Sequence, residues 1–579
     1  MPEIRTLPIA AEHREFSVKV NSQVVERTYQ LLSVSVTKVA DKISSARLVY
    51  LDGAASESVF KASNSEIFVP GNFIEILAGT TSDPELLFKG IIVRHSIKLR
   101  DISAPQLIVE CKHMAVGLTI GRKNAYFKDK TDSDIMTSIL RKAPVTPDVE
   151  TTSVTHKQMV QYYATDWDFL LTRAQANGKL VFTEGDTVTI KAPALSGRSV
   201  CTLLYGATIL EMDAEIDARW QYGAVKGVTW DPAQQAMVEK EGADPGNVAP
   251  GNLVSSDLAA VAGPSSFHLQ QTSLLETEAQ SWADAQWLKS KLSQVNGRMK
   301  CEGFAGIKPG DLVTLSGIGD RFNGDALVTG VRQSFDLQEG WKTNIQFGGA
   351  NDSLPAQDEV TAPKAGALLP GINGLQIGIV LSNEDPDNEF RVQVKMPVVD
   401  PSGDGTWARI ASLDAGDQRG FFFRPEIGDE VVLGFLDDDP RQAVILGMLH
   451  SSAKAAPLTG SDDNNEKMYQ SRAGMKLHFD DDKKIILIET PAGKKVTLDE
   501  DAGELKMMDE NGNKIVMNSD GILIQSDGKI EIKAQQDVKV EGLNVEQKAS
   551  ASFKAEGSAS AEVKASGSLT LKGATVMIN

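Results

Sequence analysis

The residue types that catalyse reactions occur in this sequence at few informative spacings. Two segments, Ser58-Val-Phe-Lys61 and Ser526-Asp-Gly-Lys529, have the Ser-x-x-Lys spacing of a serine nucleophile with a lysine base. So short a pattern arises by chance, and the second copy lies in a repeated turn. The sequence also lacks the His-Glu-x-x-His, Gly-x-Ser-x-Gly and Gly-x4-Gly-Lys-Ser/Thr motifs. We therefore predict no catalytic residue and no enzyme activity.

Metal-ligating residue types are scattered. The segment that begins at Asp509, Asp-Glu-Asn-Gly-Asn, resembles a calcium loop but lacks the glycine at position six and the glutamate at position twelve. A turn is the better interpretation. His95 and His113 could meet across neighbouring strands, but we expect ordinary hydrogen-bonded positions. Cys111, Cys201 and Cys301 are far apart and odd in number. We therefore predict no metal site, no disulfide framework and no cofactor.

Length and composition limit the class of protein. A chain of 579 residues suggests about three to five domains. The 41% hydrophobic and 24% charged residues are typical of a soluble globular protein. A net charge of −19 repels phosphate backbones, so nucleic acid is not an expected partner. The first sixteen residues lack the apolar run of a signal peptide, so we expect synthesis in the cytoplasm.

Turn-rich stretches divide the chain into three parts. They are rich in glycine, proline or acidic residues and have no sustained hydrophobic period; they are Ala243–Ser266, Asn351–Gly374 and Ser451–Glu466. We predict an N-terminal region at 1–365, a compact domain at 372–450 and a C-terminal region at 467–579.

The N-terminal region has the pattern of β-barrels with a few helices. Alternating β-branched residues predict strands at Gln30–Val39 and Gly90–Leu99. Thr131 with Asp134 predicts a helix start. A second helix is expected to be capped by Asp166 and to stop at Asn177-Gly178.

A third helix is expected after the capping-box pair Ser273 and Glu276, ending at Asn296-Gly297. Its apolar residues recur at helical spacing, and we expect them to pack in a core. They are Leu275, Ala279, Trp282, Ala283 and Leu292.

The middle domain has five strand-like runs within about 80 residues: Leu375–Ser382, Phe390–Pro397, Thr406–Ser412, Glu430–Phe435 and Gln442–Leu449. Five short strands separated by turns indicate a small barrel of the OB type. Such barrels often bind nucleic acid through basic and aromatic residues. This one is acidic, with Asp437-Asp438-Asp439 in one turn, so we do not expect that activity.

The C-terminal region repeats. Short apolar runs of three or four residues alternate with turns: Ile485–Ile488, Val496–Leu498, Leu505–Met507, Ile515–Met517 and Ile522–Ile524. The period then tightens to eight, as in Ile522, Ile530 and Val538. A fixed short period is typical of a β-solenoid or β-helix.

From Ala549 to Leu571 every second residue is apolar or small, and the residues between are Ser, Thr, Lys or Glu. This period-2 pattern exceeds the usual strand length of roughly 3–10 residues. Because the apolar face is mostly alanine and glycine, it is too small to fill a core against another sheet. A single-chain solenoid and a disordered linker are the alternatives. We favour several copies intertwined in a narrow prism, which leaves no long open edge.

Three segments then indicate a family. The run from Phe423 to Gly447, with Pro-Glu-Ile-Gly-Asp-Glu-Val and Asp-Asp-Asp-Pro, resembles the OB segment of VgrG spike proteins of type VI secretion and related contractile injection systems. Thr406-Trp-Ala-Arg-Ile is similar to a Trp-Val-Arg-Val strand of that family, and Tyr163–Leu171 to a helix of its hub region. The segment Arg391-Val-Gln-Val-Lys-Met-Pro differs from the usual aromatic, histidine-containing strand, which suggests a divergent branch.

The resemblance implies a homotrimer with a phage hub-like region, an OB-fold domain and a needle that is an intertwined triple-stranded β-helix. It implies a spike that caps an Hcp-like inner tube, contacts baseplate proteins and effector cargo, and punctures the target membrane. A PAAR-repeat protein would cap the tip, at Val576, Met577, Ile578 and Asn579. The spike would assemble at the tip of the apparatus and then be secreted or delivered into the target cell.

Other functions remain open. One is a phage-tail or extracellular-particle baseplate spike with cell-wall hydrolase activity. Another is a fibre that binds a surface ligand, although Phe553 is the only aromatic residue after Phe479.

Overall fold

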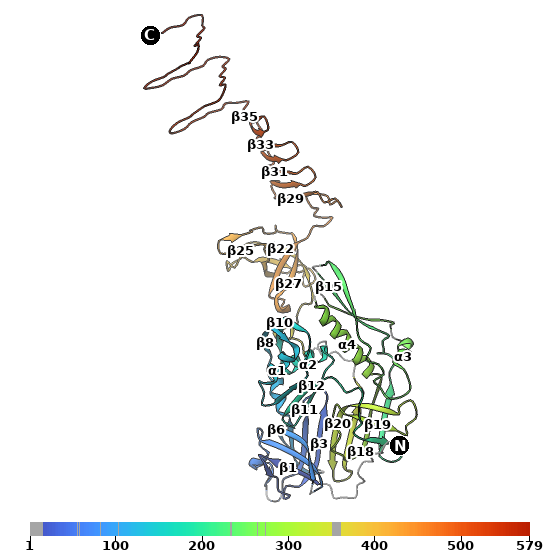
Figure 1. Cartoon of the computed structure of the whole chain (residues 1–579). Helices are drawn as coiled ribbons and strands as arrows, with labels where there is room; N and C mark the ends of the chain where they lie inside the picture. Colours follow the sequence, from blue (N-terminus) through green and yellow to red (C-terminus); the bar gives the residue numbers. More distant parts are fainter. Residues whose placement is uncertain are drawn as a thin grey trace. The chain divides into compact units, whose positions relative to one another are not determined.

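The computed structural model describes residues 15–54, 56, 58–80, 83–101, 103–231, 234–262, 264–271, 274–349 and 360–578. The chain divides into two compact units (Figure 1). The first comprises residues 1–374 and 434–443, and the second comprises residues 375–433 and 444–579. Among the residues that the structure describes, no helix has the length and apolar character needed to cross a membrane.

A 13-stranded sheet forms the base of the first unit. Its main path runs β14-β18-β21-β20-β3-β4-β7-β6-β5-β1-β2, and β13 and β19 join beside β20. The strands are β1 (Glu15–Val20), β2 (Gln23–Val24), β3 (Leu31–Val39), β4 (Ser45–Leu51), β5 (Phe73–Thr80), β6 (Asp83–Arg100), β7 (Ser103–Lys112), β13 (Thr202–Leu204), β14 (Glu211–Ile216), β18 (Val295–Glu302), β19 (Leu312–Ser316), β20 (Gly324–Asp336) and β21 (Gly340–Phe347). The strands predicted at Gln30–Val39 and Gly90–Leu99 are confirmed as β3 and part of β6.

One face of this sheet is apolar and buried. Side chains alternate along each strand, so Val34 and Val36 of β3 point into the core while Ser33 and Ser35 do not. Ile345 and Phe347 do the same on β21. Full burial of each such side chain contributes about 1.5–3 kcal/mol. The mainly β fold class predicted from the sequence is confirmed.

The three cysteines are free and lie in these cores. Cys111 and Cys301 are fully buried. Burial raises the pKa of Cys301 to about 12, which keeps the thiol protonated and unreactive.

Smaller strands and the helices complete the first unit. They are β8 (Lys123–Thr131), β9 (Thr146–Val149), β10 (Thr155–Ala164), β11 (Leu180–Glu184), β12 (Thr187–Lys191), β15 (Val225–Asp231), β16 (Ala236–Glu241) and β17 (Phe267–Gln270), with helices α1 (Asp132–Leu140), α2 (Asp166–Ala176), α3 (Ser255–Ala262) and α4 (Glu276–Leu292). The capping box of Thr131 and Asp134 at the start of α1 is confirmed. Helix α2 ends before Asn177, as predicted.

Two predicted helix boundaries are wrong in detail. The N-cap of α2 is Thr165, whose hydroxyl accepts from the Asp168 backbone, and Asp166 is the first helical residue. Helix α4 ends at Leu292, because Asn296 and Gly297 are already paired in β18.

The apolar stripe of α4 packs as expected at Ala279 and Ala283, whereas Leu275 is its exposed N-cap. Ser273 lies outside the described residues. Helix α3 lies within the stretch Ala243–Ser266, which the sequence predicted to be a linker.

A closed five-stranded barrel follows, in the order β22-β23-β24-β28-β27. Its strands are β22 (Gln376–Ser382), β23 (Val392–Lys395), β24 (Thr406–Ile410), β27 (Glu430–Phe435) and β28 (Ala443–Met448). Val392 and Val394 are fully buried, as are Val431 and Leu433, so alternate residues fill the interior. All five predicted strands are confirmed.

The second unit continues into an antiparallel seven-stranded meander. Its strands are β29 (Glu466–Gln470), β30 (Lys476–Asp480), β31 (Ile485–Glu489), β32 (Lys495–Asp499), β33 (Glu504–Met508), β34 (Lys514–Asn518) and β35 (Gly521–Gln525). Each predicted apolar run lies in one of β31–β35. Residues 527–578 are exposed throughout and form no helix or strand within this single chain; Figure 1 draws them as an extended trace.

Candidate functional site: the C-terminal end and a buried polar network

The predicted tip lies on the exposed C-terminal end of the chain. The exposed fractions of Val576, Met577 and Ile578 are 50%, 87% and 85%. Asn579 lies outside the described residues. Three successive apolar side chains are therefore available for contact, and their role in docking a cap stays a prediction.

The alternating segment before the tip also leaves its apolar face uncovered. Phe553, Val563 and Leu571 are 66%, 77% and 63% exposed. Contiguous exposed apolar surface of this kind marks a site of association. The side chains on this face have no cover within one chain.

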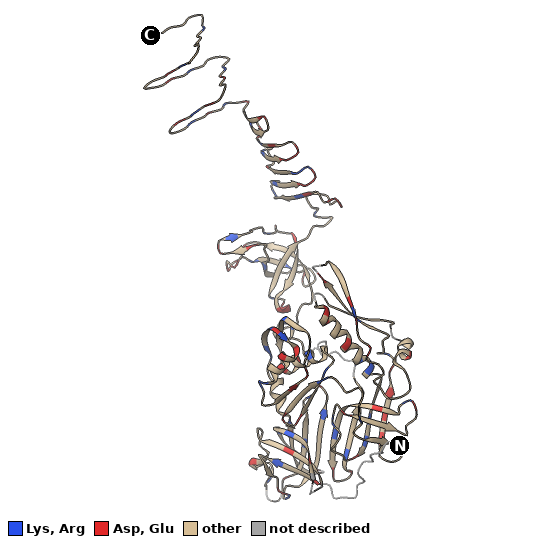
Figure 2. Ribbon diagram, viewed as in Figure 1, with Lys and Arg blue, Asp and Glu red and all other residues tan. Residues whose placement is uncertain are grey.

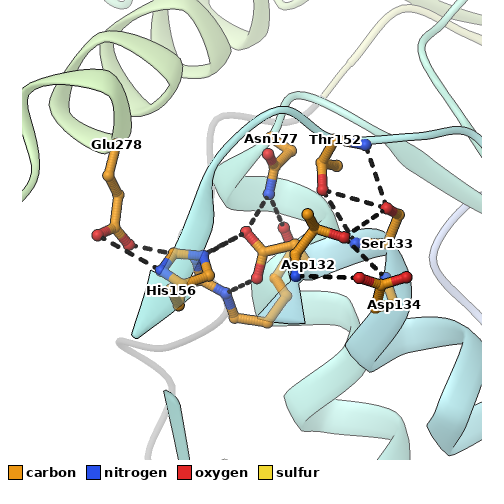
Figure 3. Close-up of polar contacts among 9 residues, drawn as sticks. Asp132, Ser133, Asp134, Thr152, His156, Asn177 and Glu278 are labelled. Atoms are coloured by element: carbon orange, nitrogen blue, oxygen red, sulfur yellow. Dashed lines mark hydrogen bonds and ion pairs between the residues drawn. The ribbon is translucent and has the colours of Figure 1, made fainter. Parts of the chain in front are cut away.

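A buried polar network in the first unit joins two helices (Figure 3). Asp132 begins α1 and is 1% exposed. Arg173 of α2 donates to both of its oxygens, from Nε to Oδ1 at 2.6 Å and from Nη2 to Oδ2 at 2.9 Å. This two-point geometry is the strongest form of an arginine–carboxylate pair.

Further groups surround this pair. Nε2 of His156, on β10, lies 3.1 Å from Oδ2 of Asp132, and its Nδ1 lies 3.8 Å from Oε2 of Glu278. Glu278, on α4, also lies 3.3 Å from Nη2 of Arg173. The Asn177 amide donates to Oδ2 of Asp132 at 2.8 Å. The network therefore joins α1, α2, β10 and α4 (Figure 3).

Hydroxyl groups fix the first turn of α1 on its other side. The backbone N–H of Ser133 donates to Oγ1 of Thr152 at 3.0 Å, and the Thr152 N–H donates to Oγ of Ser133 at 3.2 Å. These reciprocal bonds anchor the segment before β10 to the helix start that Thr131 caps.

Charge is retained within the network. Burial by itself raises the pKa of Asp132, but the hydrogen bonds and charge of Arg173, with those of Asn177 and His156, outweigh it and lower that pKa. Burial likewise disfavours the Arg173 cation, and Asp132 more than compensates, so the arginine pKa is raised. Both members stay ionised and fully engaged, which suits a structural clamp better than acid–base catalysis.

A second buried carboxylate lies at the start of α2. Asp166 accepts from Nζ of Lys123 at 2.5 Å, from Nζ of Lys142 at 3.2 Å and from the Gln161 amide at 3.1 Å. Burial by itself raises the pKa of Asp166, but the hydrogen bonds from these donors lower it by more. The pKa of Asp166 is therefore below its ordinary value. Its position at the helix N-terminus is also favourable for an anion.

The sequence did not predict either cluster. The available signal was Arg173, a charged residue next to the apolar stripe of Phe169, Leu170 and Ala174 on α2, all three of which are buried. A cation placed there needs a carboxylate partner.

In the second Ser-x-x-Lys segment, the serine and the lysine each contact another residue. Ser526 donates to Oδ1 of Asn513 at 2.5 Å, and Lys529 pairs with Glu531 at 2.5 Å. Ser58 and Lys61 are both exposed.

The predicted turn at Asp509 is confirmed. Its carboxylate accepts from the backbone of Asn511 and from both the backbone and amide of Asn513. The Asn513 bonds lower the pKa of Asp509, ahead of the opposing effect of burial.

His95 and His113 do not face each other. The register places His95 opposite Val109. His95 contacts Oγ of Ser63 at 2.8 Å and the Phe68 carbonyl at 3.0 Å, while Nδ1 of His113 accepts from the Ala115 N–H at 3.2 Å. In the described part of the chain, no three His, Cys, Asp or Glu side chains are grouped to hold a metal ion.

Family models match two parts of the chain. A family model described as the Alg8 N-terminal domain matches residues 10–336, more than half of the chain. The chain belongs to this family. A second model, the type VI secretion system/phage-baseplate injector OB domain, matches residues 376–450 and coincides with the closed barrel.

Curated relatives confirm the resemblance to VgrG spike proteins. The chain is 25% identical to the type VI secretion system spike protein VgrG1a of Pseudomonas aeruginosa over 224 residues, which cover 35% of this chain and 34% of that protein. It is 29% identical to the spike protein VgrG3 of Vibrio cholerae over 125 residues, 19% of this chain and 12% of that one. The chain thus spans about a third or less of the length of these two relatives.

Among solved structures, a tail protein of Neisseria meningitidis is 16% identical, covers 59% of this chain and 98% of its own, and has a TM-score of 0.43. An E. coli component of the type VI secretion system is 13% identical, covers 75% and 99%, and has a TM-score of 0.37. Scores this low do not assign a function.

Proposed function

We propose that three copies of this chain form the spike and hub of a contractile injection system. The first unit would cap the inner tube, the barrel would form a collar, and the C-terminal region would form the needle. The observation that carries the proposal is the OB-domain match joined to a C-terminal segment that buries no side chain alone. The similarity to VgrG spike proteins supports the same role.

The needle needs more than one copy. The alternate apolar positions of 549–571 are mainly Ala and Gly, so their backbones can approach a common axis closely. Each chain then supplies one wall of a prism, and the unpaired backbone groups of one chain bond to the next. The number three comes from the VgrG resemblance.

The role is mechanical. Opening a prism of intertwined strands requires many backbone hydrogen bonds to break together, so such a shaft resists bending when it is driven into a membrane. The Ser, Thr, Lys and Glu side chains of the other face keep the shaft soluble. Three chains of net charge −19 carry −57, which favours solubility and disfavours nucleic acid as a partner.

Partners follow from this arrangement. The exposed apolar end at Val576, Met577 and Ile578 would dock a PAAR-repeat cap, with effector cargo carried on the spike. Hcp-like tube subunits and baseplate proteins would contact the hub. We propose cytoplasmic synthesis, assembly at the apparatus tip, and then secretion or delivery into a target cell. No catalytic role is part of the proposal.

Sedimentation of the full chain tests the proposal. A trimer has a mass of about 187 kDa, three times 62.4 kDa. A well-folded monomer across the micromolar range would refute the spike role. Hydrolysis of peptidoglycan by the pure protein would instead favour the cell-wall hydrolase alternative.

A further inference from the structure

Strands β14 and β6 of the large sheet each have an open edge. Among the strands that the structure describes, β14 pairs with β18 alone. Strand β6 pairs with β7 to its end, but its pairing with β5 stops at Ile91. Within the described residues, positions 93–100 of β6 therefore have no paired strand on their second side. Open edges are sites where another strand can be added.

The open edge of β6 is basic. Arg94 and Lys98 lie on one face of the strand, followed by Arg100, and all three are exposed. Arg94 lies 3.6 Å from Glu110 across the strand pair, and Lys98 has no ion-pair partner among the described residues. The opposite face presents Ile97, which is 47% exposed, and a bulge follows between Lys98 and Arg100.

The open edge of β14 is acidic. Glu211, Asp213 and Glu215 lie on one face and are exposed, while Met212, Ala214 and Ile216 lie half-buried on the other. Figure 2 marks the acidic and basic residues along the strands of this unit. Charge pairing within the chain is incomplete, since Asp213 and Glu215 form no ion pair among the described residues.

Both charged edges lie on the same face of one sheet. Residues opposite each other in an antiparallel pair share a face. Following the register from strand to strand, that face contains Asp213, Arg298, Asn344, Arg332, Thr37, Arg47, Glu110 and Arg94. A second copy joined edge to edge would therefore align acid with base on one face and apolar with apolar on the other.

We infer that the open edge of β6 in one copy pairs with β14 of the next copy. This inference rests on the proposed trimer and names the surfaces that close it. Pairing of β14 with β14 would oppose acid to acid, and pairing of β6 with β6 would oppose base to base, which disfavours a two-fold dimer. A contact between two different surfaces repeats from copy to copy, and it closes as a ring when the rotation between copies closes, as the proposed trimer requires.

Strand direction agrees with this ring. The path from β14 to β6 contains eight strands, β14-β18-β21-β20-β3-β4-β7-β6. Every pair along it is antiparallel, so β14 and β6 run in opposite senses. If β6 of one copy pairs antiparallel with β14 of the next copy, the β14 strands of both copies run in the same direction. Copies that are related by rotation about one axis must meet this condition.

Two registers oppose acid to base on the charged face. Placing Lys98 opposite Asp213 sets Ile97 opposite Ala214 on the apolar face. A shift by two residues places Lys98 opposite Glu211 and Arg94 opposite Glu215. The strand has a bulge between Lys98 and Arg100, so Arg100 does not continue this alternation.

Cysteine cross-linking of the full chain tests the inference, because the native cysteines are all buried. Variants carrying Lys98→Cys with Asp213→Cys, or Lys98→Cys with Glu211→Cys, are oxidised with diamide and run without reductant. We expect one of the two variants to give dimer and trimer bands, and we expect these bands to disappear on reduction. The control pairs Lys98→Cys with Glu239→Cys, another exposed acidic position on an edge strand, β16, and stays monomeric on the gel.

Sedimentation distinguishes failure of the strand pairing from failure of the spike proposal. A trimer in solution without a cross-link in either variant overturns the strand pairing and leaves the spike proposal standing. A monomer in solution overturns the spike proposal and the ring with it. Circular dichroism of each variant establishes that the fold is intact.

Discussion

Asp132 and Arg173 form a two-point ion pair between α1 and α2, with N–O distances of 2.6 and 2.9 Å. The Asp132 side chain is 2% exposed and that of Arg173 is 16% exposed. His156 and Glu278 enclose the pair from β10 and α4. The first unit therefore has a charged clamp where four elements meet.

Removal of Asp132 should destabilise the first unit strongly. In Asp132→Ala the Arg173 cation stays buried without its two-point partner, and breaking a buried pair in this way costs about 3–5 kcal/mol. Urea unfolding followed by tryptophan fluorescence measures the change. Six of the seven tryptophans precede residue 375, so the signal reports mainly on the first unit.

Glu15→Ala provides the matched control. Glu15 and Arg27 form an ion pair of 2.7 Å in which both side chains are largely exposed, 46% and 86%. Its loss should change the free energy of unfolding by only about 0–1 kcal/mol. Equal effects of the two substitutions would contradict the clamp.

Low pH should lower the stability of the first unit, because its buried carboxylates Asp132 and Asp166 become protonated. The pKa values of Asp132 and Asp166 are lowered in the folded state, so their stabilisation is complete above the ordinary aspartate pKa of about 4. It is lost progressively as pH falls through the lowered values, where the folded state must take up protons.

The variant Asp166→Asn tests this pH dependence. It should be less stable than the parent chain at pH 7, because Lys123 and Lys142 lose their charged partner. The difference in urea midpoint should shrink as the pH is lowered from 5 to 2. A difference that stays constant over this range would show that the carboxylate charge is not the cause.

The sequence predicted the elements that depend on interactions between residues close together in the chain. The capping box at Thr131 depends on residues three apart, and the strands β31–β35 depend on alternation within five residues. The five barrel strands were predicted for the same reason. The needle's alternation is equally local, and it points to association because nothing in its own chain covers it.

Long-range placement was not predictable from those patterns. Arg173 lies 41 residues from Asp132, and Glu278 lies 105 residues from Arg173, so no spacing rule joins them. The end of α4 was misplaced because Asn296-Gly297 is a typical helix stop that here belongs to a strand pair. Helix α3 was missed because its flanks are rich in glycine and proline.

Charged side chains at the tip should abolish cap binding without dissociating the trimer. In the triple variant Val576→Asp, Met577→Asp and Ile578→Asp, an apolar docking surface becomes strongly acidic, and burying those charges against a cap is costly. Pull-down with a PAAR-repeat protein measures cap binding, and sedimentation measures the trimer. The control replaces Thr575 with Asp, which leaves the apolar triplet intact. Retained cap binding by the triple variant would place the cap elsewhere.

Larger side chains should destabilise the needle at its axis but not on its outer face. Ala559 and Ser560 are neighbours on opposite faces of the alternating segment. In Ala559→Leu three added side chains meet at one level of a narrow axis, and overpacking costs about 1–3 kcal/mol at each site. We expect a lower melting temperature of the needle and weaker trimerisation, whereas Ser560→Leu should change either by little. Thermal melting with light scattering measures both. If the two leucine variants behave alike, the alternating segment has no inner face, and the intertwined prism is wrong.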